Sequence, residues 1–123
     1  MDTRSTAMRI RIAWDHGEVF ARLDDTPGAR AMLAALPLQS TAASRGEEVV
    51  LSVPLRVRAG GKTRDDLEPG TVCYWPAGAS IALPFGSSAV HHDSGCQVLG
   101  RLEDDPRLLR QVRSGHLLTV TLA

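Results

Sequence analysis

The chain of 123 residues has few cysteines, few aromatic residues and no net charge. Its 14 Lys and Arg residues balance 14 Asp and Glu residues, so it lacks the long-range positive field that draws proteins onto nucleic acids. No apolar run approaches the roughly 20 residues of a membrane-spanning helix, and no basic start leads into an apolar signal core. We therefore expect no nucleic-acid partner, no membrane partner and a cytoplasmic location.

The two cysteines, Cys73 and Cys96, lack the paired spacing of a zinc or dithiol motif. Both lie in apolar or glycine-flanked stretches typical of core strands, and thiols in the cytoplasm stay reduced. The sequence also contains no nucleophile elbow, phosphate loop or dinucleotide fingerprint. We therefore expect neither a metal nor a cofactor, and the sequence alone assigns no reaction.

The composition is that of an ordinary globular domain, with 43% hydrophobic and 23% charged residues. The length fits one domain with a core of its own. We expect residues 1–7 to be a flexible N-terminal segment and residues 8–123 to form the domain.

Short strands dominate the predicted secondary structure. Apolar and polar residues alternate from Met8 to Trp14, which places Met8, Ile10, Ile12 and Trp14 on one face of a half-buried strand. Other short runs are separated by Gly, Pro and Asp turn signals. The eight predicted strands cover residues 8–14, 19–23, 48–53, 55–59, 71–75, 80–85, 96–102 and 118–122. A polar loop is expected before residue 48.

Two helices are predicted. Thr26 is a suitable N-cap before Pro27, and apolar residues then recur at helical spacing over residues 27–36. Asp105 and Pro106 begin a second helix over residues 106–114 in the same way. With no alternation of strands and long helices, this pattern predicts a mainly β fold, a closed barrel or a sandwich.

A family resemblance rests on residues 67–78, which read Leu-Glu-Pro-Gly-Thr-Val-Cys-Tyr-Trp-Pro-Ala-Gly, and on the apolar strand that ends in Phe85-Gly86. Gly46-Glu47-Glu48, the Val98–Arg101 segment and the terminal helix and strand agree with it. The chain resembles the cyclophilin-like family of small bacterial and archaeal proteins of unknown function. The resemblance implies a closed eight-stranded β-barrel with two short helices.

The resemblance does not extend to the residues of prolyl isomerase catalysis. Active cyclophilins carry an arginine in a Phe-His-Arg segment, whereas the corresponding strand here offers Ser52-Val53-Pro54. Phe85-Gly86 is similar only to the end of their Gln-Phe-Phe strand. The missing arginine would stabilise the twisted amide, so we expect no meaningful isomerase activity.

The candidate ligand site lies on the barrel wall beside the turn at residues 74–78. One of Tyr74 and Trp75 should pack inside while the other faces outward, because neighbouring strand residues point to opposite sides. We expect Phe85 to join this site, His91 or His92 to lie at its rim, and Arg56 to favour an anionic ligand.

Three functions stay open. The first is a barrel that binds a small molecule or peptide in a groove. The second is a peptidyl-prolyl isomerase, and the third is a subunit or interaction module of a larger hydrolase-type complex. The sequence also leaves open a homo-oligomer. A protease-coupled proline peptide assay separates the second function from the others, and native mass spectrometry separates the third.

Overall fold

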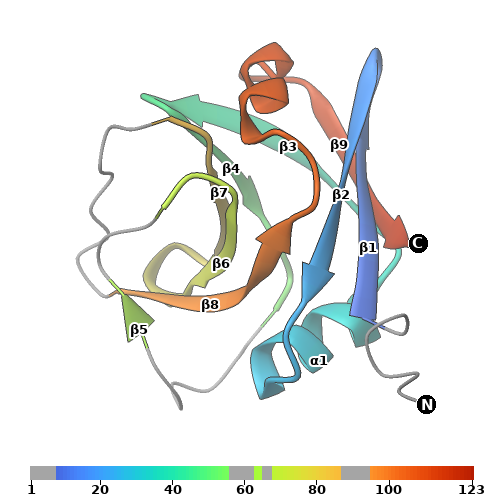
Figure 1. Ribbon diagram of the computed structural model, residues 1–123, viewed down its shortest axis with the longest axis vertical. Helices are drawn as coiled ribbons and strands as arrows, with labels where there is room; N and C mark the ends of the chain where they lie inside the picture. Colours follow the sequence, from blue (N-terminus) through green and yellow to red (C-terminus); the bar gives the residue numbers. More distant parts are fainter. Residues whose placement is uncertain (1–7, 56–62, 65–67, 87–94) are drawn as a thin grey trace.

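The computed structural model describes residues 8–55, 63–64, 68–86 and 95–123. Within these residues eight antiparallel strands close into a barrel in the order β2-β1-β9-β3-β4-β7-β6-β8, and β8 pairs again with β2 (Figure 1). The barrel strands are β1 (Arg9–Trp14), β2 (Gly17–Leu23), β3 (Leu38–Arg45), β4 (Glu48–Ser52), β6 (Thr71–Trp75), β7 (Ser80–Pro84), β8 (Cys96–Leu102) and β9 (Leu117–Leu122). A two-residue strand, β5 (Thr63–Arg64), pairs with the start of β8. The predicted closed barrel is confirmed.

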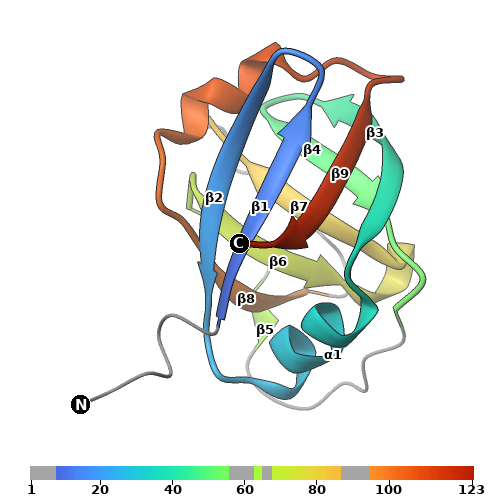
Figure 2. The same ribbon diagram turned by 90° about the vertical axis from the view of Figure 1, so that its right-hand side faces the viewer.

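Helices lie at opposite ends of the barrel, with α1 (Pro27–Ala35) at one end and the 3₁₀ helix η3 (Pro106–Gln111) at the other (Figures 1 and 2). Both N-caps form as the sequence predicts. The Thr26 hydroxyl accepts a hydrogen bond from the backbone N–H of Ala29 at 3.1 Å, and the Asp105 carboxylate accepts one from Arg107 at 2.9 Å. The second helix is shorter and tighter than the predicted 106–114. A single 3₁₀ turn, η2 (Pro76–Gly78), joins β6 to β7.

The core fills the barrel and follows the predicted alternation. Ile10, Ile12 and Val120 are buried within it. The prediction that Leu122 is also buried is wrong, because its side chain is 63% exposed. Leu122 is the last residue of β9, beyond Val120, the last inward position of that strand that the core covers.

Strand β3 corrects the expectation of a polar loop before residue 48. Its sequence, Leu-Gln-Ser-Thr-Ala-Ala-Ser-Arg, is mostly small and polar, and only Leu38 and Ala42 are buried. It is a strand because both of its edges are paired, one with β9 and the other with β4. Tertiary pairing outweighs the weak intrinsic preference of such residues. The strand predicted at 55–59 lies, apart from Leu55, outside the described residues.

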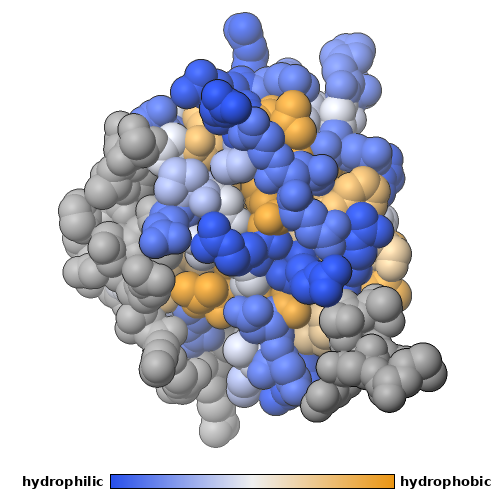
Figure 3. All heavy atoms as spheres, in the orientation of Figure 1, coloured by the Kyte–Doolittle hydropathy of each residue, from blue (hydrophilic) through white to orange (hydrophobic). Residues whose placement is uncertain are grey.

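The surface is predominantly hydrophilic on the face shown in Figure 3, where apolar residues form small separate patches. Among the described residues, no helix has the length and hydropathy needed to span a membrane.

A pair of substitutions tests whether Ile12 is buried in the core and Leu122 is exposed. We expect Ile12→Ala to lower the free energy of unfolding by about 3 kcal/mol, because it leaves a cavity among packed side chains. Leu122→Ala should cost less than about 0.5 kcal/mol, as exposed positions usually do. Urea unfolding followed by circular dichroism gives both values. Equal losses in the two variants would contradict the burial described here.

Candidate functional site

The adjacent aromatic residues Tyr74 and Trp75 serve opposite sides of the barrel wall. Tyr74 is 3% exposed and belongs to the core, where its hydroxyl donates a hydrogen bond to the backbone C=O of Leu55 at 2.7 Å. Phe85, also buried, belongs to the same core. The sequence-based prediction that Phe85 and at least one of Tyr74 and Trp75 are mostly buried is confirmed.

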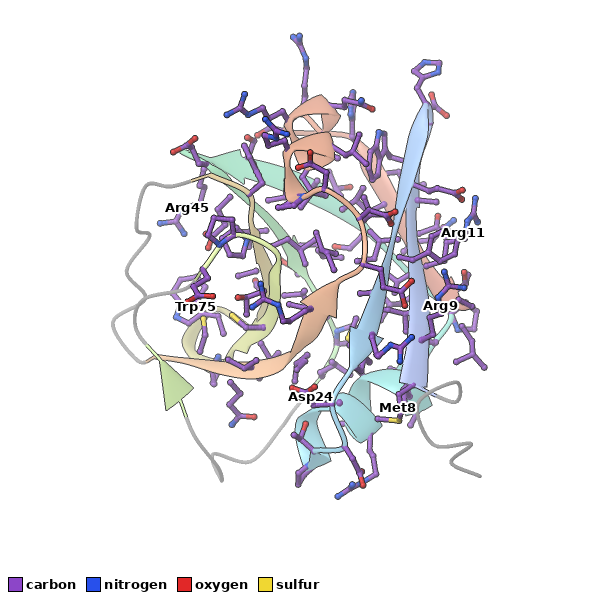
Figure 4. All side chains as sticks on the ribbon, viewed as in Figure 1. Met8, Arg9, Arg11, Asp24, Arg45 and Trp75 are labelled. Carbon is purple, nitrogen blue, oxygen red and sulfur yellow. The ribbon has the colours of Figure 1, made fainter. Side chains whose placement is uncertain are left out.

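Trp75 is half-buried on the outer side of the wall. It packs on a separate small cluster formed by Cys73, Ala82 and Cys96. The guanidinium carbon of Arg45 lies 5.8 Å from the centre of its ring, within the range of a cation–π contact. Figure 4 shows Arg45 and Trp75 on the side of the barrel away from Arg9 and Arg11.

A groove of about 340 Å³ lies at the mouth of the barrel that η3 partly covers. We call it the η3 groove. Four segments of the chain contribute to it: the turn between β3 and β4, the turn before β6, the two residues that follow β7, and η3 with its cap. Its lining residues are Glu47, Pro69, Phe85, Gly86, Asp105, Pro106, Arg107 and Arg110.

Phe85 is buried and gives the η3 groove an apolar floor. The two prolines Pro69 and Pro106 add apolar surface to the lining. The backbone N–H of Phe85 donates to the C=O of Glu47 at 2.9 Å, which ties the end of β7 to the β3–β4 turn. Residue 86 is a glycine for a steric reason. A Cβ atom there would lie 2.1 Å from the Glu47 carboxyl group, so a side chain would displace that carboxylate from the groove wall.

The rim of the groove carries two pairs of opposite charges. Asp105 accepts hydrogen bonds from the side chain of Arg107 at 2.8 to 3.2 Å and from its backbone. The hydrogen bonds from the Arg107 side chain, and to a smaller extent the one from its backbone, hold the pKa of Asp105 below its usual range. The same side-chain hydrogen bond raises the pKa of Arg107. Arg110 approaches Glu47 more loosely, with 3.9 Å between Nη2 and Oε2. That distance is beyond hydrogen-bond range, so the Arg110 donors stay available to a ligand.

A second hollow, of about 420 Å³, lies over the outer side of β1 and β9. Its lining residues are Arg11, Ala13, Trp14, Asp15, His116, Leu117 and Thr119. Arg11 already forms an ion pair with Glu18, and Leu117 is half exposed at the rim. The hollow is larger than the η3 groove but contains none of the residues that the sequence singled out as a ligand site.

The predicted site residues separate into three groups. Phe85 lines the η3 groove, Trp75 lies on the outer wall, and Tyr74 is in the core. Arg56, His91 and His92 lie outside the described residues. The sequence reasoning did not select Glu47, Arg107 or Arg110. Two arginines three residues apart after the Asp105 cap were the available signal, since residues at this spacing on a helix lie on one side. Among the described residues, no three His, Cys, Asp or Glu side chains are grouped so as to hold a metal ion.

Comparisons with known proteins agree with this architecture. The family model described as Cyclophilin-like matches residues 8–121. A hypothetical protein from Archaeoglobus fulgidus, AF2241, has a solution structure that superposes with a TM-score of 0.80 at 30% sequence identity, over the full length of both chains. The chain therefore belongs to the cyclophilin-like family.

A more distant likeness is to McbB, whose structure was solved in complex with tryptophan. The TM-score is 0.67 at 16% identity, over 91% of this chain and 44% of McbB, so this likeness shows the fold alone. No curated protein matches the chain.

The Asp105–Arg107 pair makes a testable contribution at the groove rim. Because the pKa of Asp105 is lowered in the folded state, its stabilising effect is present at neutral pH and is lost as the pH falls through the folded-state pKa. We expect Asp105→Asn to melt below the parent at pH 7. The difference should shrink as the pH falls below 3.8, the ordinary pKa of an aspartate, and it should also shrink in high salt because the pair is exposed. Melting temperatures measured from pH 7 down into acid follow the difference, and a difference that persists unchanged in acid would contradict the assignment.

Proposed function

We propose that the protein binds a small molecule or short peptide in the η3 groove and that it works in the cytoplasm. The observation that carries the proposal is the convergence of four separate chain segments on one concave surface with an apolar floor and a charged rim. Ligand sites commonly combine apolar walls with a few polar groups that fix orientation, and about 340 Å³ lies within their usual size range.

The charges of the rim limit the chemistry of the ligand. Arg107 with Asp105 and Arg110 with Glu47 form pairs without net charge, which favours a ligand that offers both hydrogen-bond donors and acceptors. An amide group or a zwitterion satisfies this condition, because its carbonyl or carboxylate oxygen accepts from Arg110. The apolar part of the ligand packs on Phe85, Pro69 and Pro106.

Titration of the ¹⁵N-labelled protein with capped dipeptides and free amino acids tests the groove. Tryptophan belongs in the panel because the fold relative McbB was solved with it. We expect one probe class to shift the backbone signals of the groove residues. Arg110→Met should weaken its binding at least about tenfold, since a hydrogen bond to a charged group contributes about 1.5–3 kcal/mol.

Arg113→Met is the matched control, because Arg113 is exposed on the same segment but does not line the groove. It should bind like the parent. Probes that shift signals only elsewhere, or that bind Arg110→Met as tightly as the parent, would contradict the proposed function.

The alternative function is a peptidyl-prolyl isomerase, and we predict no meaningful catalysis. The sequence lacks the Phe-His-Arg arginine, and the two arginines of the η3 groove face carboxylates that offset their charge. Uncatalysed isomerisation takes tens of seconds, so even a weak acceleration is visible in a protease-coupled proline peptide assay. A rate enhancement in the parent that Arg110→Met abolishes would establish the alternative.

A further inference from the structure

The only two cysteines of the chain are neighbours in the fold. Cys73 is in the middle of β6 and Cys96 begins β8, and these strands pair antiparallel. Cys73 lies opposite Val98 and Tyr74 opposite Gln97, so Cys96 comes next to Cys73 along the diagonal of the ladder. Both thiols are free, completely buried, and packed together with Ala82 beneath Trp75 on the outer side of the wall.

The two thiols belong to one small buried cluster. A hydrogen bond with the Cys96 thiol, then burial and the negative charges of Cys96 and Glu48, raise the pKa of the Cys73 thiol. The raised pKa favours the protonated thiol of Cys73, and both cysteines are free in the structure. Buried cysteines often act only as small apolar side chains. Two cysteines that served only as small apolar side chains would not need to lie in the same cluster.

The backbone beside the pair is irregular. The ladder between β6 and β8 shifts its register between Val72 and Cys73, so regular hydrogen bonding is interrupted directly beside one of the thiols. Diagonal neighbours in an antiparallel pair have Cα atoms roughly 7–8 Å apart, slightly more than a disulfide spans. A bulge increases the local twist and bends the strand, which allows the small shift that a bond between the two sulfurs requires.

We propose that Cys73 and Cys96 form a cross-strand oxidation site that reacts with small organic disulfides. One cysteine, as its thiolate, attacks a sulfur atom of the small disulfide and releases one small thiol. The second cysteine then attacks the mixed disulfide and releases the other. The S–S bond of the small disulfide breaks and one between the two Sγ atoms forms. Two electrons pass to the small disulfide, and the two protons leave with the released thiols.

The new bond fixes β6 to β8 directly beneath Trp75, whose ring Arg45 approaches from β3. Because both thiols are completely buried, the reaction proceeds through local opening of this part of the wall and is slower than that of exposed thiols. The site is independent of the η3 groove, and its test does not involve a ligand.

Intact-mass spectrometry of the folded protein with hydroxyethyl disulfide tests the proposal. We expect the mass to fall by two hydrogen atoms without a lasting hydroxyethylthio adduct, and dithiothreitol to reverse the change. The rate should depend little on low urea concentrations, since local opening exposes little surface. A stable mixed disulfide, no reaction, or a rate that rises with urea as steeply as global unfolding would overturn the proposal.

A rearranged variant provides the matched control. The double change Cys96→Ser and Gln97→Cys keeps two cysteines but moves the second thiol to the position paired with Tyr74, whose side chain lies in the core. Urea unfolding first establishes that the variant is folded. It should then show no loss of two hydrogen atoms under the same conditions. Oxidation as fast as in the parent would mean that the cross-strand placement has no part in the reaction, and the proposal would fall.

Discussion

The pairing of β2 with β8 closes the barrel, and the positions of both proposed sites depend on it. Gly100 makes this pairing possible. A Cβ atom at residue 100 would lie 2.1 Å from the carbonyl oxygen of Arg22 and 2.7 Å from the Cα of Leu23, both backbone atoms of β2 that cannot turn aside. With the seam closed, η3 follows β8 across the mouth of the barrel, and β8 is held against β6 on its other edge.

The η3 groove and the cysteine pair lie in different parts of the molecule. The groove lies at the barrel mouth that η3 partly covers, and four chain segments supply its apolar and charged lining residues. The cysteine pair is on the wall and involves only two strands and the side chains that cover them. The core between them is apolar, apart from the Tyr74 hydroxyl and a few other buried polar groups.

Local chemistry in the sequence predicts local structure well here. The caps at Thr26 and Asp105 and the alternation along β1 are present as expected, because each depends on residues within a few positions of one another. Strand β3 was missed because it exists through its partners rather than through its own residues. The groove and the contact between Cys73 and Cys96 depend on the strand order, which spacing along the chain does not contain. Phe85 was selected for its motif, and Arg110 joins it only through the closure of the barrel.

Two neighbouring residues of strand β6, Tyr74 and Trp75, pack on opposite sides of the barrel wall. The ring of Tyr74 lies in the core and its hydroxyl donates a hydrogen bond to Leu55, whereas Trp75 packs on the outer cluster of Cys73, Ala82 and Cys96. A change at residue 75 alters the packing of the outer wall and leaves the core contacts of residue 74 in place, so adjacent residues of one five-residue strand serve the two sides of the barrel separately.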